Sequence, residues 1–174
     1  NAVLYCKNTH YYNAYGALNI GGGTATGSFQ KGTNCVLNIM GHTPRVITPW
    51  NKILVDRASK VVFHLPSDGY PAAARPLMNS GGCATKFGDD CAIEFTGAEE
   101  LLAYHRDVLR RKGRYTLIQG SSIVLPDALL AAANASLPEG MSIAVENGKN
   151  ASGTACKNLV LKVAPQFGLL LIVP

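Results

Sequence analysis

The chain has 174 residues, of which 47% are apolar, 16% are charged and 18 are glycine, and this predicts one domain with its own core, built of short strands and tight turns. The net charge of +5 favours acidic partners, such as phosphate, a sulfated or sialylated glycan, or an anionic membrane surface. No apolar run reaches the roughly 18 residues of a membrane span, which excludes a membrane-spanning helix from this chain.

The start of the chain is typical of a processed protein. It begins at Asn1, with neither a methionine nor a segment of the signal type. We therefore expect residues 1–174 to form a single β-rich domain that is a mature fragment of a longer protein.

A weak internal repeat runs through the first third of the chain. ALNIGG at 17–22 recurs as VLNIMG at 36–41, with leucine, asparagine, isoleucine and glycine in the same positions. A period of about 20 residues, with one short strand in each copy, is typical of the stacked rungs of a β-solenoid. The pattern therefore predicts a mainly β fold, either a short β-solenoid or a sandwich-like arrangement.

Further strands are predicted where short apolar stretches are separated by Gly, Pro, Asn or Asp. These stretches are 53–56, 60–65, 92–95, 115–118, 142–146, 159–163 and 169–173.

One amphipathic helix is predicted over residues 97–112. The run from Thr96 to Glu99 has the pattern of a capping box, apolar residues then recur at steps of three and four, and Gly113 stops the helix. His105 falls on the apolar face, which favours a packed, hydrogen-bonded histidine. A second, shorter helix is predicted over 126–134. We expect the first helix to cap an open end of the strands.

Five cysteines lack any spacing typical of a structural zinc site, and the sequence predicts neither a metal nor a cofactor. Their odd number leaves at least one thiol unpaired. Cys83 and Cys91 flank a loop rich in Gly and Asp, and a hairpin there would bring them together. A Cys83–Cys91 disulfide and a reduced pair both stay open.

No standard catalytic motif is present. The chain has no Asp-Thr-Gly or Asp-Ser-Gly turn, no G-x-S-x-G elbow and no H-E-x-x-H pair. Asp89 and Asp90 are adjacent, so on an extended chain they point to opposite faces and cannot readily share a proton. A pair of catalytic acids would have to come from separate loops, for instance Asp68 with Asp90 or Asp56.

A basic cluster is the clearest electrostatic feature. Its five cations lie close together along the chain and are Arg106, Arg110, Arg111, Lys112 and Arg114. One interpretation is a solvated helix end that complements the helix dipole. The other is a docking patch for anionic glycans, because guanidinium groups bind sulfate and carboxylate in bidentate fashion. Aromatic residues are not interleaved with the cluster, which argues against nucleic acid as a partner.

Three tyrosines near the start of the chain form a second candidate binding cluster. Tyr11, Tyr12 and Tyr15 lie within the run YYNAY. Their rings are suited to stacking on sugar rings as well as to packing.

Three motifs in the last third of the chain carry a resemblance. They are GRYTLI at 113–118, LPEG at 137–140 and NLVLKV at 158–163. This succession of strand, turn and strand resembles the end of bacterial passenger β-solenoids of the autotransporter type. The closing GLLLIVP looks like the approach to the Val-Pro-Glu-Pro sorting tail of surface proteins from mucin-dwelling Gram-negative bacteria.

The resemblance covers about residues 90–174. It implies an exported protein of the outer cell surface or the extracellular space, a location in which cysteines are tolerated. Some proteins of this kind are secreted mucin proteases, including aspartic-type ones, so the resemblance also implies mucin as a partner. The Asp-Thr/Ser-Gly motif of such proteases is missing from this chain.

Two functional hypotheses remain, and the sequence does not decide whether the protein is an enzyme. The first is a secreted or cell-surface domain that adheres to mucin or another acidic glycan through the basic cluster, with the three tyrosines as a sugar platform. The second is a secreted mucin-degrading hydrolase, with Asp68 and Asp90 brought together from separate loops. A plainer third possibility is a structural cap that ends a longer surface protein.

Overall fold

The strands that the structure describes form three open sheets. The computed structural model describes residues 3–7, 10–12 through their backbone, 18–21, 33–48, 52–70 and 76–166. The first sheet consists of β1 Val3–Lys7, β4 Val36–Met40, β7 Lys60–His64 and β10 Ala92–Thr96, in that order. The second consists of β13 Met141–Lys149, β14 Ala155–Val163, β11 Gly113–Gly120, β8 Met78–Asn79, β5 Arg45–Ile47 and β2 His10–Tyr12. The third consists of β12 Ser122–Val124, β9 Ala84–Phe87, β6 Ile53–Val55 and β3 Leu18–Ile20.

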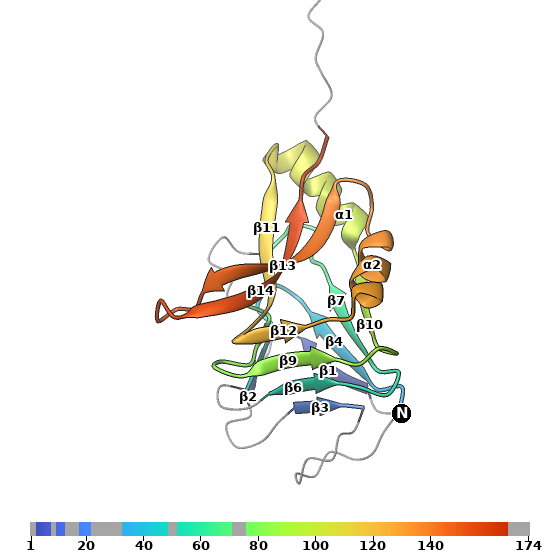
Figure 1. Ribbon diagram of the computed structural model, residues 1–174. Coiled ribbons are helices and arrows are strands. Elements are labelled where there is room, and N and C mark those ends of the chain that lie inside the picture. The colour runs from blue at the N-terminus through green and yellow to red at the C-terminus, as the bar shows by residue number, and fades with distance from the viewer. Residues whose placement is uncertain are drawn as a thin grey trace, which may run out of the picture.

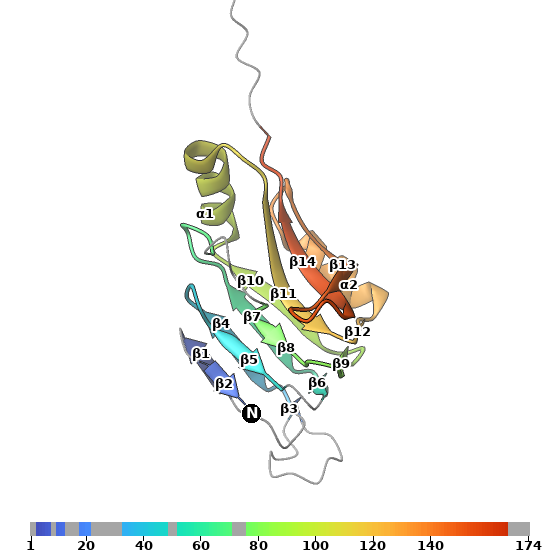
Figure 2. The same cartoon turned by 90° about the vertical axis from the view of Figure 1, so that its left-hand side faces the viewer.

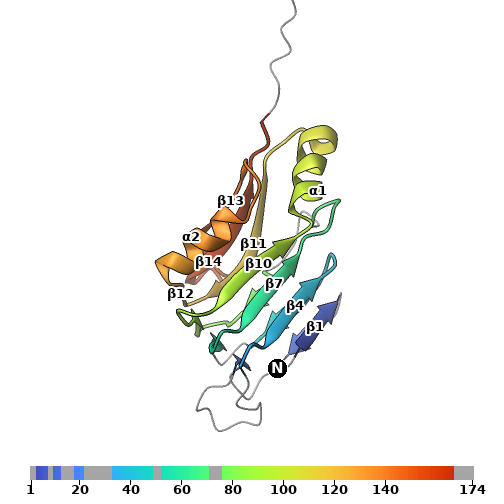
Figure 3. The same ribbon diagram turned by 90° about the vertical axis from the view of Figure 1, so that its right-hand side faces the viewer.

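The chain visits the three sheets in the same order four times. Each circuit places one strand in the first sheet, one in the second and one in the third, and all pairings between successive circuits are parallel. The third sheet is seen as a stack of short strands in Figure 1, and Figure 3 shows β1, β4, β7 and β10 side by side in the first sheet. The prediction of a mainly β fold is therefore confirmed.

The period predicted from the repeat is not the length of a circuit. Val36 pairs with Lys60 of the next circuit, and Met78 pairs with Ile118, which is much further along the chain. The two copies of the LNI repeat lie in different sheets, since one forms β3 and the other forms β4. They are successive strands along the chain and do not stack on each other.

The last part of the second sheet reverses direction. β13 and β14 form an antiparallel hairpin, and β14 pairs antiparallel with β11 (Figure 2). The helix α2 Asp127–Ala135 precedes this hairpin and packs against both β13 and β10, the last strand of the first sheet (Figure 3). The predicted strands at 115–118 and 159–163 lie within β11 and β14, and the predicted strand at 169–173 lies outside the described residues.

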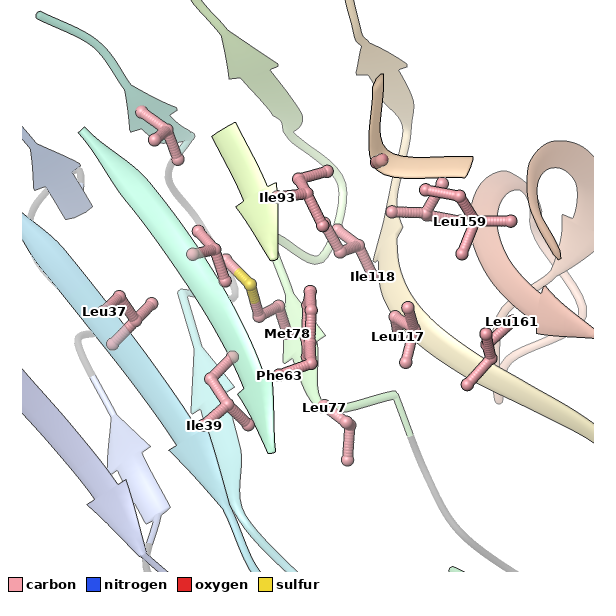
Figure 4. Close-up of a cluster of buried hydrophobic side chains, with 14 of the residues drawn as sticks. Leu37, Ile39, Phe63, Leu77, Met78, Ile93, Leu117, Ile118, Leu159 and Leu161 are labelled. Atoms are coloured by element: carbon pink, nitrogen blue, oxygen red, sulfur yellow. The ribbon is translucent and has the colours of Figure 1, made fainter. Parts of the chain in front are cut away.

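The core lies between the sheets and follows from the alternation of side chains along each strand. In β4, Leu37 and Ile39 point inward and are fully buried, while the flanking Val36 and Met40 are half-buried. Ile39 pairs in register with Phe63 of β7, and Figure 4 shows Met78 of the second sheet beside Phe63. One continuous apolar cluster thus joins all three sheets.

Both predicted helices are present, although the first differs in detail. It consists of α1 Ala98–Ala103 followed directly by a π-helix, η1 Tyr104–Leu109, and the second is α2. The helix that packs on the last strand of the first sheet is α2, whereas the sequence assigned the capping role to the first helix. No helix in the described ranges is long and apolar enough to cross a membrane.

The predicted capping box is wrong. Gly97 is the residue before α1, it has φ +74°, and the helix has no side-chain cap. Thr96 ends β10. Nε2–H of His64 donates to Oδ1 of Asn38 at 2.8 Å, so the other ring nitrogen, Nδ1, is an acceptor. The hydroxyl of Thr96 donates to this Nδ1 at 2.8 Å. The hydroxyl that would cap the helix is therefore used to link neighbouring strands of the first sheet.

The candidate disulfide between Cys83 and Cys91 does not form, and both residues are present as thiols. Cys83 precedes β9 and Cys91 follows it, with an extended segment of about 13 Å between them. β9 belongs to the third sheet and β10 to the first, so the chain turns a corner there and forms no hairpin. The two thiols cannot reach the geometry that a disulfide requires.

Candidate functional site

A cavity of about 260 Å³ lies where η1 ends and β11 begins. Its wall combines two regions that are far apart in the sequence, the turn after β7 and the segment from η1 into β11. The residues that matter for its chemistry are Asp68, Tyr70, Tyr104, Arg111, Lys112 and Tyr115. Cations, one acid and aromatic rings therefore share one hollow of the surface.

His105 fixes the turn that forms one side of this cavity. The side chain is 1% exposed, and Nδ1–H donates to the carbonyl oxygen of Arg111 at 2.9 Å. Since Nδ1 carries the proton, Nε2 accepts, and it does so from the hydroxyl of Tyr115 at 2.6 Å. This confirms the interpretation of His105 as a packed, hydrogen-bonded histidine.

The backbone around this histidine is adapted to it. Arg110 ends the π-helix with φ 48°, in the left-handed region. A β-carbon at Gly113 would lie 2.4 Å from Cε1 of His105, so only glycine lets the chain pass the ring at this distance. The turn that carries Arg111 and Lys112 is thereby held in one conformation.

The five-cation cluster divides into two groups. Arg106 is paired with its neighbour Asp107 at 2.8 Å, and Arg114 forms an ion pair with Glu146. Arg110, Arg111 and Lys112 are exposed, and within the described ranges none of them forms an ion pair. These last three residues, which we call the free cations, are available to an external anion.

The ion pairs of Glu146 with Arg114 and Lys162 lower the pKa of its carboxyl group. Hydrogen bonds from Arg114 and Lys162 lower the pKa of Glu146 from 4.5 to about 2. A carboxyl group with a lowered pKa stabilises the fold above its ordinary pKa and loses this contribution as the pH falls through the folded value.

We therefore expect the parent to melt at a higher temperature than Glu146→Gln at pH 7, and this difference to disappear between pH 4.5 and 2. Thermal unfolding followed by circular dichroism across this range tests the prediction. Glu99→Gln, a change of an exposed acid that forms no ion pair in the described ranges, is the control and should show no such convergence. A difference in melting temperature between the parent and Glu146→Gln that persists at pH 2 would show that the ion pairs of Glu146 are not its cause.

Asp68 is the acid in the cavity wall. Nε2–H of His42 donates to its Oδ1 at 2.6 Å, and this hydrogen bond lowers the pKa of Asp68. The side chains of His42 and Asp68 are 47% and 63% exposed, so the carboxylate remains open to solvent. Asp68 is one of the two acids predicted for a catalytic pair, and it lies in a wall that also contains cations and aromatic rings.

Asp90, the predicted partner of Asp68, lies elsewhere. It accepts a hydrogen bond from the backbone N–H of Ala58 at 2.8 Å, in front of the amino end of β7, whereas Asp68 follows the carboxyl end. The length of β7, about 16 Å, separates these two positions. The structure therefore does not bring Asp68 and Asp90 together. Asp56 also precedes β7, so it lies at the same end of this strand as Asp90 and away from Asp68.

Two tyrosines pack beside the acid. The rings of Tyr70 and Tyr115 meet edge to face with centroids 5.3 Å apart, and burial raises the pKa of both phenols. Tyr70 is 7% exposed, and its hydroxyl has no hydrogen-bond partner in the part of the chain that the structure describes. A buried hydroxyl without a partner costs about 1–3 kcal/mol.

The predicted tyrosine platform cannot be placed. Tyr11 and Tyr12 belong to β2, of which the structure describes only the backbone, and Tyr15 lies outside the described residues. The aromatic residues at the cavity are instead Tyr70, Tyr104 and Tyr115, which the sequence did not select. The GRYTL strand places Tyr115 directly after the basic cluster, and this was the one available signal for it.

Within the described residues, no three or more His, Cys, Asp or Glu side chains are grouped so as to hold a metal ion. Comparison with family models, with curated protein sequences and with solved structures finds no match to this chain.

Proposed function

We propose that this protein is a secreted or cell-surface domain that binds anionic glycans, such as those of mucin, at the free cations. The observation that carries the proposal is that Arg110, Arg111 and Lys112 are exposed and form no ion pair in the described ranges, and that the last two line a cavity with aromatic walls. Guanidinium groups recognise sulfate and carboxylate through paired hydrogen bonds, and aromatic rings pack on sugars.

The fold suits such a role. We propose that the four parallel circuits are a short β-solenoid, in which α2 and the β13–β14 hairpin end the stack. The rigid stack would hold the turn at 110–112 in place while the cations meet a ligand. The resemblance of residues 90–174 to passenger domains of exported proteins agrees with this proposal and with an extracellular location.

The alternative of an aspartic-type mucin hydrolase is supported less well. That chemistry needs two carboxyl groups that share a water or lie across a sugar groove. Asp68 is the one acid among the described residues that line the cavity. Its proposed partner Asp90 lies at the other end of β7.

The double variant Arg110→Ala/Arg111→Ala tests the proposal. We expect its affinity for immobilised mucin and heparin to fall about tenfold, since each exposed ion pair contributes up to about 1 kcal/mol. The retention of the parent should decrease steeply with salt, because exposed charges are screened. Elution from both resins in a salt gradient gives the measurement.

Arg106→Ala is the matched control, because Asp107 already holds that guanidinium group. It should elute close to the parent. Equal losses for the control and the double variant would show that total charge, and not the free cations, governs retention. If the parent is retained on neither resin, the proposed function is wrong.

A further inference from the structure

We infer that the cavity binds one terminal sugar acid of a glycan, with the carboxylate of the sugar at Arg111 and Lys112 and its hydroxyl groups at Asp68. This inference rests on the proposed function, which it makes more specific. It concerns the cavity and its acid, whereas the proposed function needs only the exposed cations.

The first argument is size. The cavity of about 260 Å³ lies below the roughly 300–1,000 Å³ of pockets that take drug-sized ligands. It therefore suits a single ring and not a length of chain. An internal segment of a polysaccharide would have to run past it across the surface.

The second argument is the mixed charge of the wall. A carboxylate among cations makes unfavourable contacts with a ligand that is negative over its whole length, such as a sulfated polysaccharide. A sugar acid carries its charge at one end and hydroxyl donors at the other. Arg111 and Lys112 suit the first end and Asp68 suits the second.

The third argument is that Asp68 is prepared to accept hydrogen bonds. The hydrogen bond from His42 lowers the pKa of Asp68, so the group stays ionised in neutral solution. An ionised carboxylate offers about four lone-pair positions, of which His42 and the backbone N–H of Asp68 itself use two. Sugar hydroxyl groups can donate to the others, and hydrogen bonds to a charged acceptor are stronger than those between neutral groups.

The fourth argument is the hydroxyl of Tyr70, a buried donor that lacks a partner in the described part of the chain. Tyr70 lines the same cavity as Asp68, and its ring packs on that of Tyr115. A ligand oxygen at this wall would supply the missing hydrogen bond. Tyr104, whose ring meets His105 edge to face, adds apolar surface for the sugar ring.

Titration calorimetry with sialyllactose, its carboxyl-reduced form and lactose tests the inference directly. We expect the parent to bind sialyllactose at least tenfold more tightly than the other two. Asp68→Asn should weaken sialyllactose binding about tenfold and, at the same time, raise the salt concentration needed for elution from heparin. Asp89→Asn, the same change in the turn between β9 and β10, is the control and should leave sialyllactose binding unchanged.

Tyr70→Phe separates a ligand contact from a structural role. Removal of a hydroxyl that has no partner in the described residues should leave the melting temperature unchanged or slightly higher. Sialyllactose affinity should nevertheless fall severalfold. A variant that melts lower and binds as the parent does would assign this hydroxyl to the fold and overturn its part in the site.

The outcomes distinguish the two proposals. If the parent is retained on heparin but binds sialyllactose no better than lactose, the sugar-acid inference is wrong and the proposed function stands. If sialyllactose binds and neither Asp68→Asn nor Tyr70→Phe changes its affinity, the site is not this cavity. If the parent binds neither heparin, mucin nor sialyllactose, both proposals fall.

Discussion

Replacement of Phe63 by alanine will lower the free energy of unfolding by about 4 kcal/mol. Phe63 is fully buried, and its ring stacks on that of Phe95 with centroids 5.9 Å apart. On its other side it pairs in register with Ile39 of β4. The substitution leaves a void between two adjacent strands of the first sheet, and the short strands on each side have little freedom to close it.

Urea denaturation followed by far-UV circular dichroism measures this loss. Val108→Ala is the control, because Val108 is 65% exposed on η1 and its truncation should change stability by no more than about 0.5 kcal/mol. A loss below about 1 kcal/mol for Phe63→Ala would show that the apolar cluster does not form around β7.

Gly97→Ala will lower the free energy of unfolding by about 3 kcal/mol. The residue has φ +74°, and the left-handed region costs a residue with a β-carbon about 1–2 kcal/mol. The added carbon would also lie 2.4 Å from the carbonyl oxygen of Leu65. That backbone is held by a hydrogen bond from the N–H of Leu65 to the oxygen of Thr96, so it cannot move away at low cost.

Gly153→Ala separates the two causes of this effect. Gly153 has φ +80°, and a β-carbon there meets nothing within 4 Å. Its substitution should therefore cost only the roughly 1–2 kcal/mol of the left-handed conformation. Both variants are compared with the parent by thermal and urea unfolding. Equal losses for the two would rule out the contact with Leu65 as a source of destabilisation.

The strands were predictable from the sequence, but their stacking order was not. Alternation of apolar and polar residues is a local property, and it correctly located segments such as the one that contains Leu37 and Ile39. Stacking depends on the number of residues in one circuit, and this number varies, since Val36 pairs with Lys60 whereas Met78 pairs with Ile118. The offset between the two LNI copies is the spacing of two successive strands, whereas strands that stack, such as those of Val36 and Lys60, lie a whole circuit apart.

The candidate site, too, was only partly predictable from the sequence, because it depends on contacts between residues far apart in the chain. The run at 106–114 predicted the cations, but which of them are neutralised depends on Glu146, which lies far along the chain from its partner Arg114. Asp68 and Tyr70 reach the cavity from the turn after β7, a proximity that no spacing in the sequence encodes. The capping box failed for a similar reason, because the hydroxyl of Thr96 is taken by a histidine from another strand.

The reversal of strand direction at β14 has a consequence for solubility. Parallel stacks expose rows of unpaired N–H and C=O groups at their ends, and such edges recruit strands from other molecules. At the far end of this protein, α2 packs on β10, and β14 occupies the edge of β11 that a fifth parallel strand would use. The outermost strand, β13, carries Glu146 and Lys149, and charges on an edge strand oppose edge-to-edge aggregation.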